Sequence, residues 1–305
     1  MVLAGLIAFP VGAQQPSADW SRCVNPGTAF SRDEQISGCT AVLQSGRETT
    51  ADHAIAYNNR GIAYRAKGDH DRAIADFSEA LKLNPTLAPA HNSRGLAYQA
   101  KGDIDRAISD YTEAIKLNPS GVRPYFNRGN AYREMLDYDR AIADYNRAIE
   151  INPRHDGAFT NRGNVYREKG DIERAIADYT EAINLNPSQA IAHFVRGLAY
   201  QFKGDRDQAI ADYTRAIDID PQNARYYNNR AWAYFKAGKA AQGLADAERS
   251  LQIRPNDAVT LDIRGHIFEA LGRREEAIAD FRRALSIEPK QRSSTQAPKR
   301  LGAAP

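Results

Sequence analysis

The sequence has few cysteines, little excess charge and none of the short motifs that mark common active sites. Its 305 residues include two cysteines and six histidines, and the formal net charge is only +3. A nearly neutral chain lacks the electrostatic attraction on which non-specific nucleic-acid binding relies. The histidines show no metal-ligand spacing, and no HExxH, GxSxG or phosphate-binding glycine motif is present. We therefore expect no enzyme activity, no cofactor, no metal and no nucleic-acid partner.

Long apolar runs are also scarce, and the clearest one lies at the start of the chain. Residues 1–13, MVLAGLIAFPVGA, combine an apolar stretch with small residues suited to a cleavage site. The stretch is shorter than the roughly 20 residues that a membrane-spanning helix needs. We interpret it as a secretory signal peptide and expect the true start upstream of Met1, because nothing basic precedes Arg22. The prediction is a periplasmic or secreted protein without a membrane span in its mature form. A frayed cytosolic N-terminus and an uncleaved anchor are the alternatives.

The two cysteines, Cys23 and Cys39, follow this segment and precede the repetitive part of the chain. In an exported protein an even number of cysteines is typical of a disulfide. A closed loop of this size stabilises the fold by about 3 kcal/mol in the chain-entropy model. The alternative is a pair of reduced core cysteines. A zinc site is not expected, because a third cysteine and a nearby pair of histidines are both missing.

Repetition is what the sequence has in abundance. Prolines recur every 34 residues without an insertion or deletion, at Pro85, Pro119, Pro153, Pro187, Pro221, Pro255 and Pro289. A fixed period in this range is typical of a solenoid, whose units bury an apolar face only by stacking. Within each block, apolar residues at helical spacing flank a turn such as AKGDHD. Each block is therefore predicted to form two antiparallel helices, with Gly in the turn and Asp capping the second helix.

This pattern resembles the tetratricopeptide repeat (TPR) family. In the first block, the resemblance rests on Tyr57, Gly61, Tyr64, Ala73, Phe77, Ala80 and Pro85. It implies an all-α, right-handed superhelical solenoid of seven helix-turn-helix repeats. It also implies that the first helices line a concave groove that binds peptide segments of partner proteins. The predicted repeats are residues 54–87, 88–121, 122–155, 156–189, 190–223, 224–257 and 258–291.

The segments that flank the repeats are predicted to form a cap and a tail. Residues 33–43, DEQISGCTAVL, parallel residues 71–81, DRAIADFSEAL. We therefore interpret residues 14–53 as an N-terminal half-repeat that caps the solenoid and is held by a Cys23–Cys39 bridge. Residues 292–305 are rich in Pro, Ser and Ala without an apolar period, which predicts a disordered tail.

Two blocks depart from the pattern where the departure should affect packing. In the sixth block, Ala231 stands in the Gly column, Gly243 in an Ala column and Ala247 in the aromatic column. We expect this block to be the least stable. In the third block, Leu136 replaces the glycine of the turn, so the geometry of that turn is left open.

Two charged columns are identical in all seven blocks. One holds Arg60, Arg94, Arg128, Arg162, Arg196, Arg230 and Arg264, and the other holds Asp76, Asp110, Asp144, Asp178, Asp212, Asp246 and Asp280. In an antiparallel hairpin the two columns fall opposite each other, so we predict a structural ladder of Arg–Asp pairs between the helices. Its role would be register and stacking, because a buried arginine without its carboxylate is costly. A row of anion-binding arginines is the alternative.

A third column predicts contact with a ligand. Asn59, Asn127, Asn161 and Asn229 share one position of the first helix. The TPR resemblance implies that such amides bind the backbone of an extended peptide, since an amide both donates and accepts. Neighbouring candidate groove residues are Asn130, Asn164, Arg133, Arg167, Phe126, Phe194 and Trp232. The alternative is that the asparagines are tolerated exposed positions. Lysines beside them are missing, which disfavours recognition of a free C-terminal carboxylate.

The sequence as a whole predicts a non-enzymatic scaffold for a protein or peptide partner. One alternative is a self-assembling homo-oligomer that stacks through terminal helices around Phe281 and Leu285. The other is the regulatory arm of a separate cell-envelope enzyme.

Overall fold

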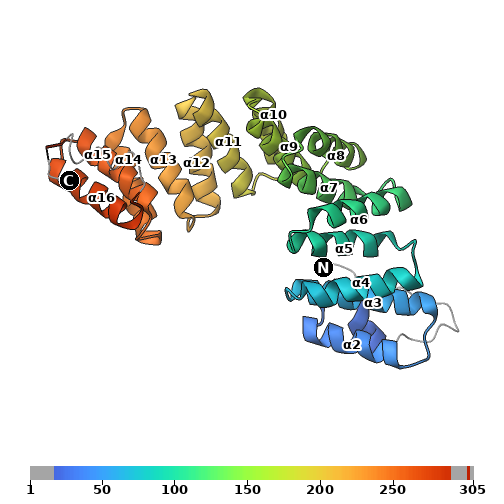
Figure 1. Ribbon diagram of the computed structural model, residues 1–305. Helices are drawn as coiled ribbons and strands as arrows, with labels where there is room; N and C mark the ends of the chain where they lie inside the picture. Colours follow the sequence, from blue (N-terminus) through green and yellow to red (C-terminus); the bar gives the residue numbers. More distant parts are fainter. Residues whose placement is uncertain (1–16, 290–300, 303–305) are drawn as a thin grey trace, which may run out of the picture. The chain divides into compact units, whose positions relative to one another are not determined.

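A computed structural model describes residues 17–289 and 301–302, and within them all regular structure is helical (Figure 1). The predicted signal peptide, residues 1–13, lies outside the described residues. Contacts between helices divide the chain into two compact units, Met1–Ile151 and Asn152–Pro305.

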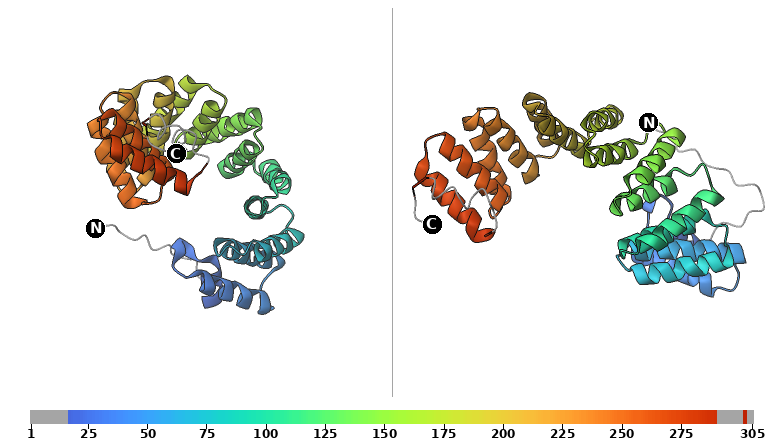
Figure 2. Two further views of the ribbon diagram at one scale, coloured as in Figure 1. Left: turned by 60° about the vertical axis from the view of Figure 1, so that its left-hand side comes forward. Right: turned by 45° about the horizontal axis from the view of Figure 1, so that its top comes forward.

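The first unit consists of an N-terminal helical pair followed by three hairpins. The pair is α1 (Ala18–Val24) and α2 (Arg32–Gln44), joined through a short 3-10 helix (Pro26–Thr28). The hairpins are α3 (Thr50–Ala66) with α4 (His70–Leu83), α5 (Ala88–Ala100) with α6 (Ile104–Leu117), and α7 (Val122–Glu134) with α8 (Tyr138–Ile151). The first helices α3, α5 and α7 contact one another in order, so they form one face of this unit (Figure 2).

The second unit consists of four hairpins. They are α9 (Asp156–Glu168) with α10 (Ile172–Leu185), α11 (Ala190–Lys203) with α12 (Arg206–Ile219), α13 (Ala224–Lys236) with α14 (Ala240–Ile253), and α15 (Ala258–Ala270) with α16 (Arg274–Ile287). First helices are again in contact, α9 with α11 and α13 with α15. Each unit is thus built as a stack of hairpins whose first helices share a face.

The predicted repeat boundaries match the helix starts in six of the seven hairpins. The first helices from α5 onward begin at residues 88, 122, 156, 190, 224 and 258. The exception is α3, which begins at Thr50 rather than at residue 54. Thr49 and Asp52 form a capping box there, each side chain accepting from the other residue's backbone N–H. Residues 50–53, predicted to belong to the cap, are therefore the first turn of the first hairpin.

Six of the seven hairpins place a glycine of the first helix against an aromatic ring of the second. A Cβ added at Gly61 would lie 2.7 Å from the ring of Phe77, which is fully buried. In the sixth hairpin Ala231 replaces the glycine and Ala247 replaces the ring. The two changes occur together because a methyl group and a ring cannot share this space. The lower stability predicted for this hairpin remains a prediction.

The N-terminal pair of helices caps the first unit as a half-repeat. Cys23 and Cys39 form a disulfide with an S–S distance of 2.07 Å, and both are fully buried. They pack in a cluster with Val42 and with Ala56 of α3. The helix α2 thus covers α3 in the way that the second helix of a repeat covers the next repeat.

Within the segment predicted to be disordered, residues 301–302 pack against the last hairpin. Leu301 packs against the buried cluster of Phe268, Ala277 and Phe281, and the Nε of Arg274 donates to the Leu301 carbonyl at 2.6 Å. The prediction is therefore wrong for residues 301–302, while residues 292–300 and 303–305 lie outside the described part. Leu301 instead adds an apolar side chain to the core of the seventh hairpin.

The turn of the third hairpin keeps the geometry of the other turns despite its leucine. Leu136 has φ 61°, in the left-handed region, and its side chain is 69% exposed. The glycines of the other turns, such as Gly68 and Gly102, have φ values of 81° and 79°. A non-glycine residue in this region costs about 1–2 kcal/mol, so the strain falls on Leu136.

We predict that Leu136→Gly raises the free energy of unfolding by about 1 kcal/mol, because glycine adopts a positive φ without steric cost. The thermal midpoint, followed by circular dichroism at 222 nm, should rise by roughly 2 to 4 °C. Leu136→Ala is the matched control, since it removes the exposed side chain and keeps the Cβ. An equal gain from alanine would mean that the side chain, not the backbone, carries the cost.

Candidate functional site

The two charged columns pair across every hairpin of the described chain. In the first hairpin, Arg60 donates from Nε to Asp76 Oδ2 and from Nη2 to Asp76 Oδ1, both at 2.8 Å. The other six pairs have the same bidentate geometry, at 2.6–2.9 Å. The aspartate side chains are only 6–9% exposed and the arginines 16–22%. Their position between the helices fits the structural role predicted for the ladder and leaves the carboxylate-bound edge of each guanidinium unavailable to an external anion.

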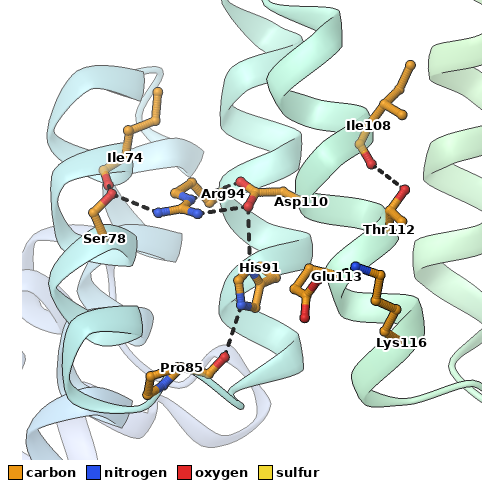
Figure 3. Close-up of polar contacts among 10 residues, drawn as sticks. All are labelled: Ile74, Ser78, Pro85, His91, Arg94, Ile108, Asp110, Thr112, Glu113 and Lys116. Atoms are coloured by element: carbon orange, nitrogen blue, oxygen red, sulfur yellow. Dashed lines mark hydrogen bonds and ion pairs between the residues drawn. The ribbon is translucent and has the colours of Figure 1, made fainter.

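Five of these arginines also join neighbouring hairpins through a hydroxyl group. Arg94 donates from Nη1 to Ser78 Oγ at 3.2 Å, and the same hydroxyl donates to the Ile74 carbonyl at 2.7 Å (Figure 3). The equivalent acceptors are Thr40 for Arg60, Thr112 for Arg128, Thr180 for Arg196 and Thr214 for Arg230. This Ser/Thr column was not predicted from the sequence, although a hydroxyl residue stands two positions after the ladder aspartate in these blocks. Its first member, Thr40, lies on α2, which supports the half-repeat interpretation.

A histidine extends the ladder in the second hairpin. His91 lies with Nδ1 3.3 Å from Asp110 Oδ1 and Nε2 3.1 Å from the Pro85 carbonyl oxygen (Figure 3). Burial alone would raise the pKa of Asp110, but hydrogen bonds from Arg94 and His91 outweigh it and hold this pKa below its usual value. His193 repeats the contact to a proline carbonyl, with Nε2 3.2 Å from the Pro187 oxygen. Both histidines thus serve packing.

We predict that Asp110→Asn destabilises the protein by about 3 kcal/mol, because Arg94 loses its buried carboxylate. The contribution of this carboxylate also depends on pH. The pKa of the Asp110 carboxyl is lower in the folded state than in the unfolded state, where it is about 4. The stabilisation is therefore complete at pH values above the unfolded-state pKa, and it is lost as the pH falls through the folded-state pKa. Urea unfolding at pH 7 and pH 3 should show a smaller acid-induced loss in the variant. Asp105→Asn, at an exposed position of the same helix, should leave both values unchanged.

The four asparagines of the predicted peptide-binding column are not equivalent. Asn127 donates from Nδ2 to Asn92 Oδ1 of the preceding first helix at 2.9 Å. Asn229 donates to the Arg225 carbonyl of its own helix at 2.8 Å, so this amide is partly used. Asn59 accepts from its neighbour Asn58 at 3.3 Å, and Asn161 lies half-buried on α9. Asn127 thus lies in an amide pair between two hairpins.

Asn130 and Asn164 have a structural role that the sequence analysis did not foresee. The hydroxyl of Tyr145 donates to Asn130 Oδ1 at 2.7 Å, and the hydroxyl of Tyr179 donates to Asn164 Oδ1 at 2.8 Å. In two other hairpins a glutamine takes this role: Gln99 accepts from Tyr111 at 2.8 Å and Gln201 accepts from Tyr213 at 3.0 Å. These polar residues of the first helix therefore satisfy tyrosines that are buried in the core.

The predicted aromatic groove residues divide between core and surface. Phe194 is only 2% exposed, and its ring lies 4.9 Å from that of Tyr226, so the prediction that it lines the groove is wrong. It fills space between two hairpins instead. Phe126 is half-buried with its ring 6.0 Å from that of Tyr145, and Trp232 is half-buried beside Phe235. Arg133 is half-buried on α7.

A pocket of about 360 Å³ opens on the first-helix face of the first unit. Its lining includes Ile62 of α3, Pro89 and Asn92 of α5, and Arg123 of α7. The apolar floor and convergent polar groups are the features that ligand sites in proteins share. Because Asn92 accepts from Asn127, the amide pair lies at this pocket.

A second pocket, of about 300 Å³, lies within the second unit. It is lined by Arg167 of α9, Ile172 of α10, and Leu198, Gln201 and Phe202 of α11. Arg167 is the one predicted groove residue that lines it. Its Nε is buried without a hydrogen-bond partner in the described part of the chain.

Residues 17–289 and 301–302 contain no group of three or more His, Cys, Asp or Glu side chains arranged to hold a metal ion. Over the same residues, no helix combines the length and apolar character needed to cross a membrane.

Models of known protein families match the chain over the same residues that form the hairpins. Tetratricopeptide repeat models match residues 54–87, 88–120, 122–155, 144–177, 224–257 and 260–291, and a further TPR repeat model matches 163–204 and 202–238. The chain belongs to the tetratricopeptide repeat family. The TPR fold is typical of scaffolds for protein–protein interaction and generally lacks catalytic function.

Solved structures share the fold. A tetratricopeptide repeat protein from Parabacteroides merdae aligns with a TM-score of 0.59 at 23% identity, over 83% of this chain and 99% of that protein. MamA aligns with a TM-score of 0.50 at 30% identity, over 54% of this chain and 97% of MamA. YrrB, described as a TPR protein with an unusual peptide-binding site, aligns with a TM-score of 0.52 at 21% identity, over 61% and 95%. Comparison with curated proteins gives no match.

Proposed function

We propose that this TPR protein is a non-enzymatic scaffold that binds extended peptide segments of partner proteins on the face formed by its first helices. The observation that carries the proposal is the pocket of the first unit, which lies on that face and includes Asn92. An amide there can donate to a peptide carbonyl and accept from a peptide N–H. The peptide-binding site described for YrrB is consistent with this function.

The pocket offers both parts of peptide recognition. Ile62 and Pro89 provide apolar surface for a side chain, while Asn92 and Ser93 provide polar groups beside it. Arg123 at the rim is exposed and adds a positive charge. Backbone contacts of this kind give affinity with modest sequence preference, which suits a scaffold.

We predict that the Asn92→Ala, Asn127→Ala double variant loses at least tenfold in partner capture from cell-envelope extract. The loss follows because the amide pair at the pocket is removed. Capture is quantified by affinity purification on the oxidised protein, with thermal stability matched beforehand. Asn184→Ala is the control, since Asn184 is exposed on the second helix α10. Equal capture by the double variant and the control would contradict binding at this pocket.

We also propose that the protein is exported to the periplasm or secreted. The buried disulfide between Cys23 and Cys39 supports this proposal, because disulfides persist in oxidising compartments. Expression in a bacterial host with its native leader should give a mature form that lacks residues 1–13 and has no free thiol. Intact-mass measurement with and without thiol alkylation checks both points. Retention of Met1–Ala13, or alkylation of both cysteines without prior reduction, would contradict export.

Self-assembly around Phe281 and Leu285 has less support. Phe281 is fully buried and packs in the cluster that includes Leu301. Leu285 is half-buried and Ile287 is 41% exposed, which leaves little apolar surface on the last helix.

A further inference from the structure

The pocket of the second unit has an exposed aromatic side chain at its edge. Phe202 is 75% exposed at the end of α11, the most exposed of the large hydrophobic side chains in the described chain. Leu198, one turn earlier, and Ile172 of α10 line the pocket next to it. An aromatic side chain at this exposure gains free energy only when another surface covers it.

One N–H group of the arginine at this pocket is also without a hydrogen-bond acceptor. Arg167 has a buried Nε without a hydrogen-bond partner among the described residues. The ladder arginines, in contrast, are all bound to aspartates, and Lys203 beside the pocket pairs with Glu173 at 2.9 Å. A buried guanidinium N–H without an acceptor is costly, so an external acceptor is favoured here.

The repeat structure provides an internal comparison, because equivalent residues recur 102 positions apart. Arg65, Gln99 and Tyr111 of the first unit correspond to Arg167, Gln201 and Tyr213. The Nε of Arg65 is also buried without a hydrogen-bond partner among the described residues, so the two units differ in what lies beside the arginine. In the first unit, Gln99 accepts from Tyr111 and donates from Nε2 to Glu134 Oε1 at 2.5 Å. The protein's own carboxylate therefore occupies this place in the first unit. Burial first and then the charge of Glu134 raise the pKa of Tyr111.

The second unit has the equivalent glutamine that accepts from a tyrosine, but it has no carboxylate at the position of Glu134. Gln201 accepts from Tyr213 at 3.0 Å, as Gln99 does from Tyr111. The residue equivalent to Glu134 is Lys236, whose Nζ lies 5.4 Å from the centre of the Trp232 ring. A lysine thus occupies the sequence position at which the first unit has a glutamate.

The apolar part of the pocket is likewise particular to the second unit. Phe202 and Ile172 correspond to Ala100 and His70 of the first unit, while Leu198 corresponds to Leu96. The two sets of changes go together: where the internal carboxylate is missing, the neighbouring surface has become apolar.

We propose that this pocket binds an extended segment of a partner protein that carries an aspartate or glutamate next to a large apolar side chain. The carboxylate accepts from the Nε2 group of Gln201, as Glu134 accepts from Gln99 in the first unit, and also from the Nε group of Arg167. The apolar side chain covers Phe202 and Leu198. The proposal rests on the peptide-binding function proposed above and assigns it a second site with a stated preference. The chain's own C-terminal tail does not fit, because Lys290, Arg292, Lys299 and Arg300 make it basic.

The test is a selection of random ten-residue peptides, displayed with both ends blocked by flanking sequence, on the oxidised full-length protein. Recovered peptides are then synthesised with capped ends and titrated by fluorescence polarisation. We expect enrichment of Asp or Glu beside Phe, Leu, Ile or Trp, and at least tenfold weaker binding when the acid is replaced by its amide. Arg167→Ala and Phe202→Ser should each weaken binding at least tenfold. Arg65→Ala, at the equivalent position of the first unit, should not.

If the alanine variants alter stability, the charge-reversal variant Arg167→Glu tests the proposal through a change of peptide preference. Circular dichroism confirms folding, and a selection on this variant should favour Lys or Arg in place of the acid. A peptide with a free C-terminal carboxylate and no acidic side chain is titrated separately. If this peptide bound more tightly than the capped acidic peptides, the proposal that the pocket recognises an Asp or Glu side chain would be overturned.

The remaining outcomes separate the two proposals. In one outcome, the selected peptides bind the parent and the Arg167→Ala, Phe202→Ser double variant equally but do not bind the Asn92→Ala, Asn127→Ala variant. This result would overturn the proposed site in the second unit and would leave the proposed peptide-binding function standing. Recovery of no peptide by any variant or by the parent would overturn both. Concentration-dependent self-association that is abolished by Phe202→Ser would identify a second copy as the occupant and overturn the proposed partner.

Discussion

The arginine–aspartate pair between the two helices of each hairpin is the interaction on which the rest of the structure depends. It holds two charges that are largely removed from water, and such charges are tolerated only when both are fully hydrogen-bonded. The bidentate contact of Arg94 with Asp110 sets the register of the helices, because one geometry aligns both oxygens with both donors. The additional donation to Ser78 extends this register to the preceding hairpin. The same bond type thus defines the hairpin and its stacking.

Close packing beneath this ladder explains why several polar residues of the first helices have structural roles. The rings of Tyr145 and Tyr179 lie against glycines, so their hydroxyls reach the face of the first helix. There they require an acceptor, and Asn130 or Asn164 provides it. A residue on the first-helix face is therefore partly determined by the core behind it. In hairpins whose ring is phenylalanine, as at Phe77, no hydroxyl imposes this requirement.

The two ends of the repeat array solve the same problem in different ways. A hairpin at either end exposes the surface that a neighbour would bury. At the N-terminal end, α2 covers α3 and continues the ladder through Thr40, while the Cys23–Cys39 disulfide joins α2 to α1. At the C-terminal end, Leu301 packs against the buried cluster that includes Phe268 and Phe281. A helix covers the N-terminal end of the array, and a single apolar side chain contacts the C-terminal end.

The sequence by itself determined the repeat number, the helical hairpins, the register of the arginine and aspartate columns and the cysteine pair. These follow from spacing, because a strict period places equivalent side chains in equivalent positions. Only the tertiary structure decided which residues face solvent. Phe194 and Phe202 lie eight residues apart on one helix, yet one is buried and the other is exposed. Likewise, Asn130 accepts from a tyrosine while Asn127 pairs with Asn92. The physical reason is that burial and hydrogen-bond partners depend on neighbouring hairpins, which a single helical period does not specify.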